Sequence, residues 1–185
     1  MKPRTSESHP LQIAFVETPG HGRIGMTFCP GKHDPRAKTG PWSRDMHTDI
    51  AAIADWGAVA LVTLMESHEL DLLGVSGLGD AVLAQGMGWY HLPVQDVSVP
   101  NAAFEVQWAD ASRVLRSQLL AGQSIVVHCR GGLGRTGIVA ARLLIELGEK
   151  PVTALERVRA ARPGAVETAE QEYYVLGLRD SNSYK

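Results

Sequence analysis

The stretch that decides the fold is SIVVHCRGGLGRTG, residues 124–137. Residues 124–128 include three β-branched residues in a row, which predicts a buried strand. A glycine-rich turn follows it, and residues 136–147 form a run that is apolar on nearly every helical face. We expect this run to be a helix at the centre of the fold. A strand, a tight loop and a helix in this order predict a loop at the carboxyl end of a sheet.

The predicted loop has the composition of an anion site. Gly131, Gly132 and Gly134 allow backbone conformations with positive φ and remove side chains that would obstruct an anion. Backbone N–H groups turned inward, together with the helix N-terminus near Thr136, attract a phosphate group. Arg135 can bind two phosphoryl oxygens through its planar guanidinium group. The expected phosphate-binding residues are Arg130, Gly131, Gly132, Leu133, Gly134 and Arg135.

Cys129 stands at the base of this predicted loop. The N–H groups and the helix terminus that attract phosphate also favour the thiolate form of a cysteine, which is the nucleophile. A cysteine at the end of a buried strand is more often a core residue, but the six positions of fixed type around Cys129 outweigh that interpretation. Thr136 is a candidate to donate its hydroxyl to the sulfur and so ease departure of the thiolate. His128 is expected to order the loop by hydrogen bonding rather than to transfer a proton.

A phosphoryl transfer also needs an acid for the leaving oxygen, because an alkoxide or phenoxide leaves poorly. Asp96 is the acidic residue between Tyr90 and Phe104. It follows a predicted strand over residues 89–94, and the carboxyl end of a strand is where an α/β sheet places its chemistry. An aspartate in a loop is often only a turn former, so its position alone does not make Asp96 the acid.

Along the rest of the chain, short apolar runs alternate with helical stretches. This pattern predicts an α/β fold with a central, mostly parallel sheet flanked by helices. The other predicted strands are residues 11–16, 24–28 and 58–65, the first two as a hairpin at a sheet edge, with an irregular loop over residues 29–42. The other predicted helices are residues 43–56 with Ser43 as N-cap, 78–85, 101–121 with Asn101 as N-cap, 152–161 and 167–178.

Length and composition limit the classes of function. A chain of 185 residues predicts a single domain over residues 1–185, with residues 1–9 and 180–185 as flexible tails. A formal net charge of −2 gives no overall field for nucleic acid or an acidic membrane surface. No apolar run approaches the roughly 18 residues of a membrane span, so we expect a cytoplasmic protein. The histidines have no metal-binding spacing, and neither a metal nor a cofactor is expected.

The chain has two cysteines, Cys29 and Cys129, which points to a reducing compartment rather than a disulfide framework. Cys29 is expected to be packed at a strand end. The alternative is that Cys29 serves as a resolving thiol for Cys129 under oxidation.

The pattern His-Cys-x5-Arg-Thr resembles the signature of cysteine-dependent protein tyrosine and dual-specificity phosphatases. The resemblance implies that His128 is the loop histidine, Cys129 the nucleophile, Arg135 the phosphate-binding arginine and Thr136 the hydroxyl donor. Asp96, which lies 33 residues before Cys129, has a spacing typical of the general acid of that family. Residues 25–31 (GMTFCPG) and the Pro-x-x-Asp acid loop are most similar to kinase-associated phosphatases, the cyclin-dependent kinase inhibitor 3 type.

The sequence departs from the pattern of the family in two places. The acid loop, residues 93–96, is PVQD rather than Trp-Pro-Asp, and there is no Asn-Arg-Tyr phosphotyrosine loop, so we expect a shallower pocket. Residues 167–173 (ETAEQEY) resemble the loop that positions water in the family, with Glu167 where its first Gln usually stands. Gln171 remains as the candidate for aligning water.

The resemblance implies a phosphoprotein phosphatase that hydrolyses phosphotyrosine, and in some members phosphoserine and phosphothreonine, through a phosphocysteine. Its partner would be a phosphorylated protein, and the oligomeric state stays open. Two alternatives remain. One is a phosphatase of phosphoinositides or nucleotides, but lipid-directed relatives place lysines in a loop where this chain has only Arg130 as an added cation. The other is a non-catalytic phosphoprotein-binding module, which we would expect to lack the cysteine, the arginine or the acid.

Overall fold

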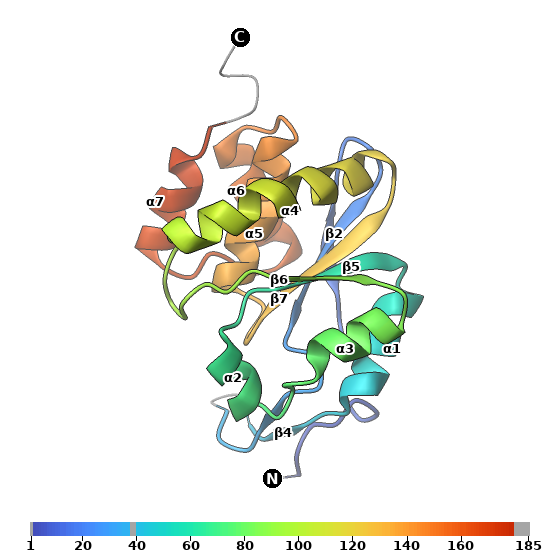
Figure 1. Cartoon of the computed structure of the whole chain (residues 1–185). Coiled ribbons are helices and arrows are strands. Elements are labelled where there is room, and N and C mark those ends of the chain that lie inside the picture. The colour runs from blue at the N-terminus through green and yellow to red at the C-terminus, as the bar shows by residue number, and fades with distance from the viewer. Residues whose placement is uncertain (1, 38–39, 180–185) are drawn as a thin grey trace.

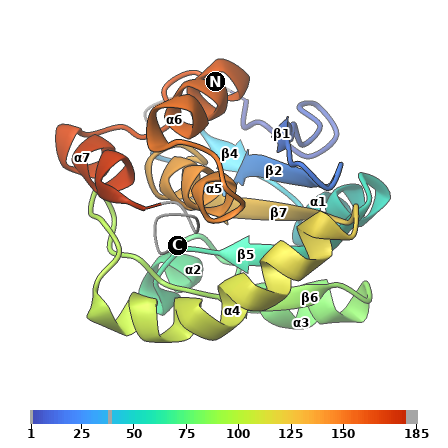
Figure 2. The same cartoon turned by 90° about the horizontal axis from the view of Figure 1, so that it is seen from above.

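The computed structural model describes residues 2–37 and 40–179, and its centre is a twisted sheet. Within those residues the sheet has five strands in the order β1-β2-β7-β5-β6 (Figure 2). They are β1 (Ala14–Glu17), β2 (Arg23–Phe28), β7 (Ser124–Cys129), β5 (Ala58–Thr63) and β6 (Gly88–His91). Strands β2, β7, β5 and β6 run parallel, and β1 pairs antiparallel with β2 at the edge. The predicted mostly parallel sheet and the edge hairpin are confirmed.

Helices cover both faces of this sheet (Figure 1). One face carries α4 (Ala102–Leu120) and α5 (Gly134–Glu146), with α6 (Pro151–Ala161) and α7 (Ala169–Gly177) packed against α5. The other face carries α1 (Met46–Asp55) and α3 (Leu78–Ala84). Because its two faces and both its edges are covered, β7 is buried along its whole length. No helix among the described residues is long and apolar enough to cross a bilayer.

The strand register brings the carboxyl ends of the parallel strands together. Cys129 pairs with Phe28 on one side of β7, and His128 pairs with Thr63 on the other. The loops that follow these strands therefore meet at one edge of the sheet, as they do in other open α/β folds. Helix α5 leaves the loop after Cys129 and, as predicted, is buried at every residue except Glu146.

Several element boundaries differ from the sequence prediction. Strand β1 begins at Ala14 rather than at residue 11, and α1 has Asp45 rather than Ser43 as its N-cap, since the Asp45 side chain accepts from Thr48 N. Helix α5 begins at Gly134 and α7 at Ala169. Strand β6 spans Gly88–His91 rather than residues 89–94. Such shifts are the usual error of inferring boundaries from periodicity.

Two regions contain structure that the sequence did not predict. The segment predicted as an irregular loop holds a short hairpin of β3 (His33–Asp34) and β4 (Trp42–Ser43). Residues after β5 form α2 (Ser67–Leu72), a six-residue helix. Its signal was a capping box between Glu66 and Glu69, not periodicity.

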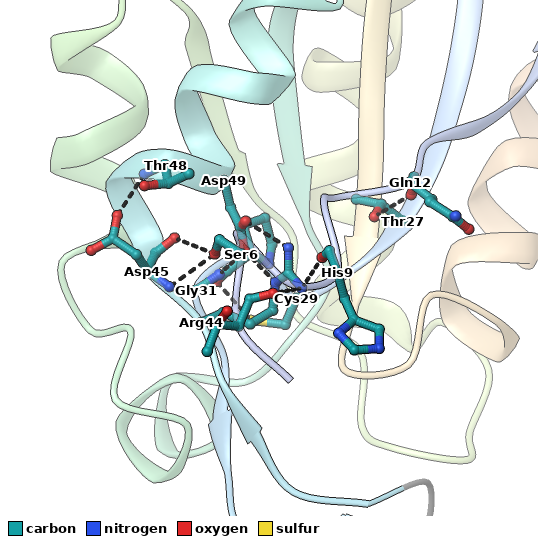
Figure 3. A network of polar contacts seen from close by, with 12 residues as sticks. Ser6, His9, Gln12, Thr27, Cys29, Gly31, Arg44, Asp45, Thr48 and Asp49 are labelled. Carbon is teal, nitrogen blue, oxygen red and sulfur yellow. Dashed lines mark hydrogen bonds and ion pairs between the residues drawn. The ribbon is translucent and has the colours of Figure 1, made fainter. Parts of the chain in front are cut away.

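The start of the chain contacts the rest of the structure instead of forming the expected tail. Ser6 is buried and exchanges hydrogen bonds with the backbone of Asp45. Arg44 Nη1 donates to the carbonyl of His9 at 2.7 Å, as Figure 3 shows. Residues 180–185, the other expected tail, lie outside the described residues.

Candidate active site

The loop after β7 wraps around the sulfur of Cys129. Cys129 is only 4% exposed, and its Sγ accepts a hydrogen bond from Gly132 N at 3.2 Å. A backbone N–H directed at sulfur stabilises negative charge there. The sequence predicted that backbone N–H groups of the loop turn inward, and the N–H group of Gly132 does so.

The three glycines of the loop differ in how strongly their surroundings require glycine. Gly132 has φ +71°, and a Cβ there would lie 2.4 Å from the backbone of Thr27. Gly134 lacks a positive φ, but its Cβ would lie 2.4 Å from a carboxylate oxygen of Glu167. Gly131 also lacks a positive φ, and a Cβ there would meet none of the described residues within 4 Å. Of the three glycines, Gly132 is therefore the one that uses the positive φ that glycine allows.

Arg162, at the C-terminus of α6, holds the outside of the loop. Its Nε donates to the carbonyl of Gly132 at 3.1 Å and its Nη2 to the carbonyl of Gly131 at 3.2 Å. Carbonyls fixed outward leave the N–H groups of the same peptides free to face inward. Sequence reasoning did not find Arg162, which lies 30 residues beyond Gly132 and in no recognisable motif.

Arg135, at the start of α5, is held in place by hydrogen bonds to α2 and to the backbone before Asp96. Glu69 of α2 binds its guanidinium through both carboxylate oxygens, at 2.6 and 2.9 Å, and the carbonyl of Val94 accepts from Nη1 at 2.9 Å. Burial lowers the pKa of Arg135, but the hydrogen bonds to Glu69 and the negative charges of Glu69, Asp96 and Cys129 together outweigh burial, and the net shift is upward. Burial raises the pKa of Glu69, but the hydrogen bonds from Arg135 and the backbone outweigh it, and the net shift is downward. Glu69 is the second residue that sequence reasoning missed.

Asp96 lies across the mouth of the loop from Cys129. Its Oδ1 lies 2.9 Å from Nη2 of Arg135 and accepts from Val97 N at 3.1 Å, while 56% of its side chain stays exposed. Val97 has φ +57°, a left-handed conformation that is strained for a β-branched residue. Asp96 and Glu69 therefore both bind the guanidinium of Arg135.

His128 is fully buried and belongs to a chain of hydrogen bonds. Trp89 Nε1 donates to Thr63 Oγ1 at 2.9 Å, and Thr63 Oγ1 lies 2.8 Å from His128 Nε2. His128 Nδ1 lies 3.4 Å from the carbonyl of Cys129, and because a carbonyl can only accept, this contact assigns the ring proton to Nδ1 and leaves Nε2 to accept from Thr63. Burial lowers the pKa of His128 to about 3, so the ring stays neutral. This geometry orients the residue that carries the sulfur.

The expected contact of Thr136 is not made, whereas Cys29 is packed at a strand end as expected. Thr136 Oγ1 is buried without a hydrogen-bond partner among the described residues, so its expected bond to the sulfur is not made in this structure. Cys29 is a free, fully buried thiol after β2, and burial raises its pKa. Its Sγ lies 3.5 Å from the carbonyl of Pro30.

Glu167 and Gln171, the candidates from the water-positioning motif, have different surroundings. The Gln171 amide is fully buried, accepting from Glu167 N at 2.9 Å and donating to Ser98 O at 3.2 Å, two residues after Asp96. Glu167 instead faces the site, where its carboxylate accepts from Gly134 N at 2.8 Å. Val166, just before it, has φ +59°. The Gln171 side chain thus connects α7 to the loop that contains Asp96. The Glu167 carboxylate binds Gly134 N, one of the backbone N–H donors of the anion loop.

These side chains surround an open pocket of about 540 Å³. The residues that line it include Cys129, Arg130, Gly131, Asp96, Val97 and Glu167. A second hollow of about 430 Å³ adjoins it, sharing Asp96 and Arg130. The nucleophile candidate, the acid candidate and the anion loop therefore open into one cleft.

Comparison with known proteins agrees with this geometry. Residues 37–149, more than half of the chain, match the family model described as "Polymorphic toxin system, DSP-PTPase phosphatase". The chain is 26% identical over 185 residues to cyclin-dependent kinase inhibitor 3 of Sus scrofa, covering 97% of this chain and 84% of that protein. It is 28% identical over 160 residues to the protein of that name from Homo sapiens, covering 85% of this chain and 72% of the relative.

Solved structures show the same fold. Kinase-associated phosphatase, crystallised with serine in place of its catalytic cysteine, superposes with a TM-score of 0.78 at 24% identity, over 90% of this chain and 93% of the other. The active form of Tk-PTP superposes with a TM-score of 0.64 at 28% identity, over 89% and 92%. The resemblance inferred from the signature loop is confirmed. The chain belongs to the polymorphic toxin system DSP-PTPase phosphatase family and is a cysteine-dependent phosphatase of the tyrosine and dual-specificity class.

Proposed function

We propose that this enzyme hydrolyses phosphotyrosine in proteins, and phosphoserine and phosphothreonine where they reach the sulfur, through a phosphocysteine intermediate. The observation that carries the proposal is that Cys129 and Asp96 line one cleft and that Asp96 pairs there with Arg135. Gly132 N donates to the Cys129 sulfur, and Arg135 Nη2 lies 2.9 Å from Asp96. A nucleophile, an anion-binding fork and an acid within one cleft are what phosphoryl transfer needs.

In the first step, the phosphoryl group binds the backbone of residues 130–135 and the guanidinium of Arg135. The Cys129 thiolate attacks phosphorus, so that an S–P bond forms while the P–O bond of the ester breaks. Asp96 gives its proton to the leaving oxygen. For this, Asp96 must first release Nη2 of Arg135, which then binds the phosphate.

In the second step, water attacks phosphorus, the S–P bond breaks and inorganic phosphate leaves. Asp96, now ionised, accepts a proton from the water. Gln171 is a positioning residue in this scheme, because its amide holds the backbone at Ser98 and thereby the acid loop. The hydroxyl of Thr136 has no partner in the described structure and is available to donate to the departing thiolate.

We take residues 1–185 as one domain, supported by the single layered arrangement around the central sheet. A cytoplasmic location is supported by two cysteines that are both free thiols.

The experiment that tests the function compares wild type with Cys129→Ser on p-nitrophenyl phosphate in the presence of EDTA. We expect wild-type turnover that is lost in the variant, while circular dichroism shows the same fold in both. Phosphotyrosyl, phosphoseryl and phosphothreonyl peptides of one sequence then give the residue preference. Turnover that survives in Cys129→Ser, or wild-type turnover restricted to phosphoinositides or nucleotides, contradicts the proposal.

A further inference from the structure

Lys32 is a buried cation whose charge is favoured by the nearby Asp34, although Asp34 forms its ion pair with Arg130 instead. Lys32 lies between β2 and β3, is 7% exposed, and has no ion pair or side-chain hydrogen bond within residues 2–37 and 40–179. Its Nζ lies 4.8 Å from the ring centroid of Phe28 and 4.5 Å from that of Trp42. The rings stabilise the cation through their faces but accept no conventional hydrogen bond, so the three N–H donors of the ammonium stay available.

The backbone on both sides of Lys32 is held rigidly. Asp49 accepts from Gly31 N at 2.8 Å, and Arg44 N donates to the carbonyl of Lys32 at 3.2 Å. Arg44 and Asp49 form an ion pair whose side chains are buried from solvent (Figure 3). This network fixes the backbone of Lys32. The loss of conformational entropy when an anion binds at Lys32 is therefore small.

Lys32 and Arg36 both line the pocket that contains Cys129. The carboxylates of that pocket are engaged elsewhere. Asp34 pairs with Arg130 at 2.8 Å, Asp96 pairs with Arg135, and Glu167 accepts from the anion loop. Arg36, like Lys32, has no ion pair in the described part of the chain. The pocket is therefore lined by two cationic side chains, those of Lys32 and Arg36, that form no ion pair within the described residues.

We propose that Lys32 and Arg36 form a second anion site beside the phosphate-binding loop. The preferred substrate is then a phosphorylated peptide that carries a second anionic group, a phosphate or a carboxylate, on a residue next to the one that Cys129 attacks. The inference rests on the proposed function, since it specifies which phosphoproteins this cleft selects. Burial lowers the pKa of Lys32, and an anion at Nζ would oppose that shift.

A protein substrate fits these observations better than a membrane lipid. Binding to an acidic membrane surface usually needs a cluster of several Lys and Arg residues. This chain has a formal net charge of −2. The two cations instead lie within a pocket, one of them almost wholly buried, where a side chain of a peptide can reach them.

The test uses two phosphotyrosyl peptides that differ only at the neighbouring residue, phosphothreonine in one and alanine in the other. The quantity compared is the ratio of their kcat/KM values within each variant, counting phosphotyrosine hydrolysis alone. We expect wild type to favour the doubly anionic peptide about tenfold, and Lys32→Met and Arg36→Ala each to reduce that ratio to about twofold. Lys32→Arg keeps a cation and should retain most of the preference. Arg113→Ala, on the exposed face of α4, removes an equal charge and should keep the wild-type ratio.

A ratio is used because a purely structural role for Lys32 would slow both peptides equally. Equal ratios in wild type and Lys32→Met overturn the second site while leaving phosphopeptide hydrolysis intact. If wild type cleaves p-nitrophenyl phosphate but neither peptide, the proposed function fails instead. Selective loss of hydrolysis in Lys32→Met on vesicles that contain phosphoinositides, with unchanged peptide ratios, would overturn the peptide assignment.

Discussion

Arg135 Nη2 lies 2.9 Å from Asp96 Oδ1, so the phosphate-binding arginine and the acid candidate share an ion pair at the mouth of the site. A phosphoryl group needs the same Nη2. Substrate binding and the pairing of Asp96 therefore compete, and substitutions at Asp96 should affect binding and chemistry in opposite directions.

Asp96→Asn removes both the proton donor and the charge that competes for Arg135. We expect kcat for a poor leaving group to fall by about 100-fold or more, and the inhibition constant of inorganic phosphate to stay equal or decrease. Steady-state kinetics across the acidic to neutral range should show loss of the limb at higher pH. An unchanged pH profile in Asp96→Asn would remove Asp96 from the mechanism.

Glu167→Gln removes a negative charge from the backbone donor of Gly134. The glutamine keeps an oxygen that can accept from Gly134 N but no longer repels a phosphate dianion. We expect the inhibition constant of inorganic phosphate to decrease about tenfold. Glu172→Gln is the matched control, because Glu172 pairs with Arg159 and does not line the pocket. Equal effects of the two substitutions would mean that only net charge matters.

Glu69→Ala breaks the buried ion pair beneath Arg135. We expect the free energy of unfolding, measured with urea, to fall by about 3 kcal/mol, because a buried guanidinium loses its carboxylate partner. The value of kcat/KM should fall as well, since Arg135 loses its orientation. Glu66→Ala is the control: it removes the other half of the capping box of α2 and should cost about 1 kcal/mol. A smaller loss in Glu69→Ala than in Glu66→Ala would show that the ion pair is dispensable.

Acid should destabilise the fold through His128. The pKa of His128 is about 3 in the folded state against an ordinary value of 6.5, so the unfolded chain binds an extra proton between these values. Stability is therefore present above pH 6.5 and is lost as the pH falls toward 3. From about pH 7.5 to about pH 5.5 we expect a loss of about 1.4 kcal/mol from this group, measured by urea unfolding at each pH. His128→Gln should show a correspondingly flatter pH dependence, and an identical slope in both proteins would refute the assignment.

The sequence predicted the parts of the site that are local in the chain. Cys129 and Arg135 lie in one strand–loop–helix stretch, so a short pattern specifies both their chemistry and their proximity. Asp96 was found because it follows a predicted strand, and the carboxyl ends of parallel strands share one edge.

The supporting residues could not be predicted, because their roles depend on contacts between distant segments. Glu69 lies 66 residues before Arg135 and belongs to a helix too short for a periodic signal. Arg162 contacts backbone carbonyls of the loop, which leaves no complementary residue to recognise in the sequence. Glu167 accepts from Gly134 N directly after Val166, whose left-handed backbone conformation the residue type does not reveal.

Val97 and Val166 adjoin the two carboxylates of the cleft, and both have left-handed backbone conformations that valine adopts at a cost. Selection in the laboratory for thermal tolerance should therefore favour asparagine or glycine at the exposed Val97 early, since either relieves the conformation with little loss of packing. In such a variant, the backbone next to Asp96 would be more flexible. Heat resistance and turnover are thus expected to trade against each other at this single position.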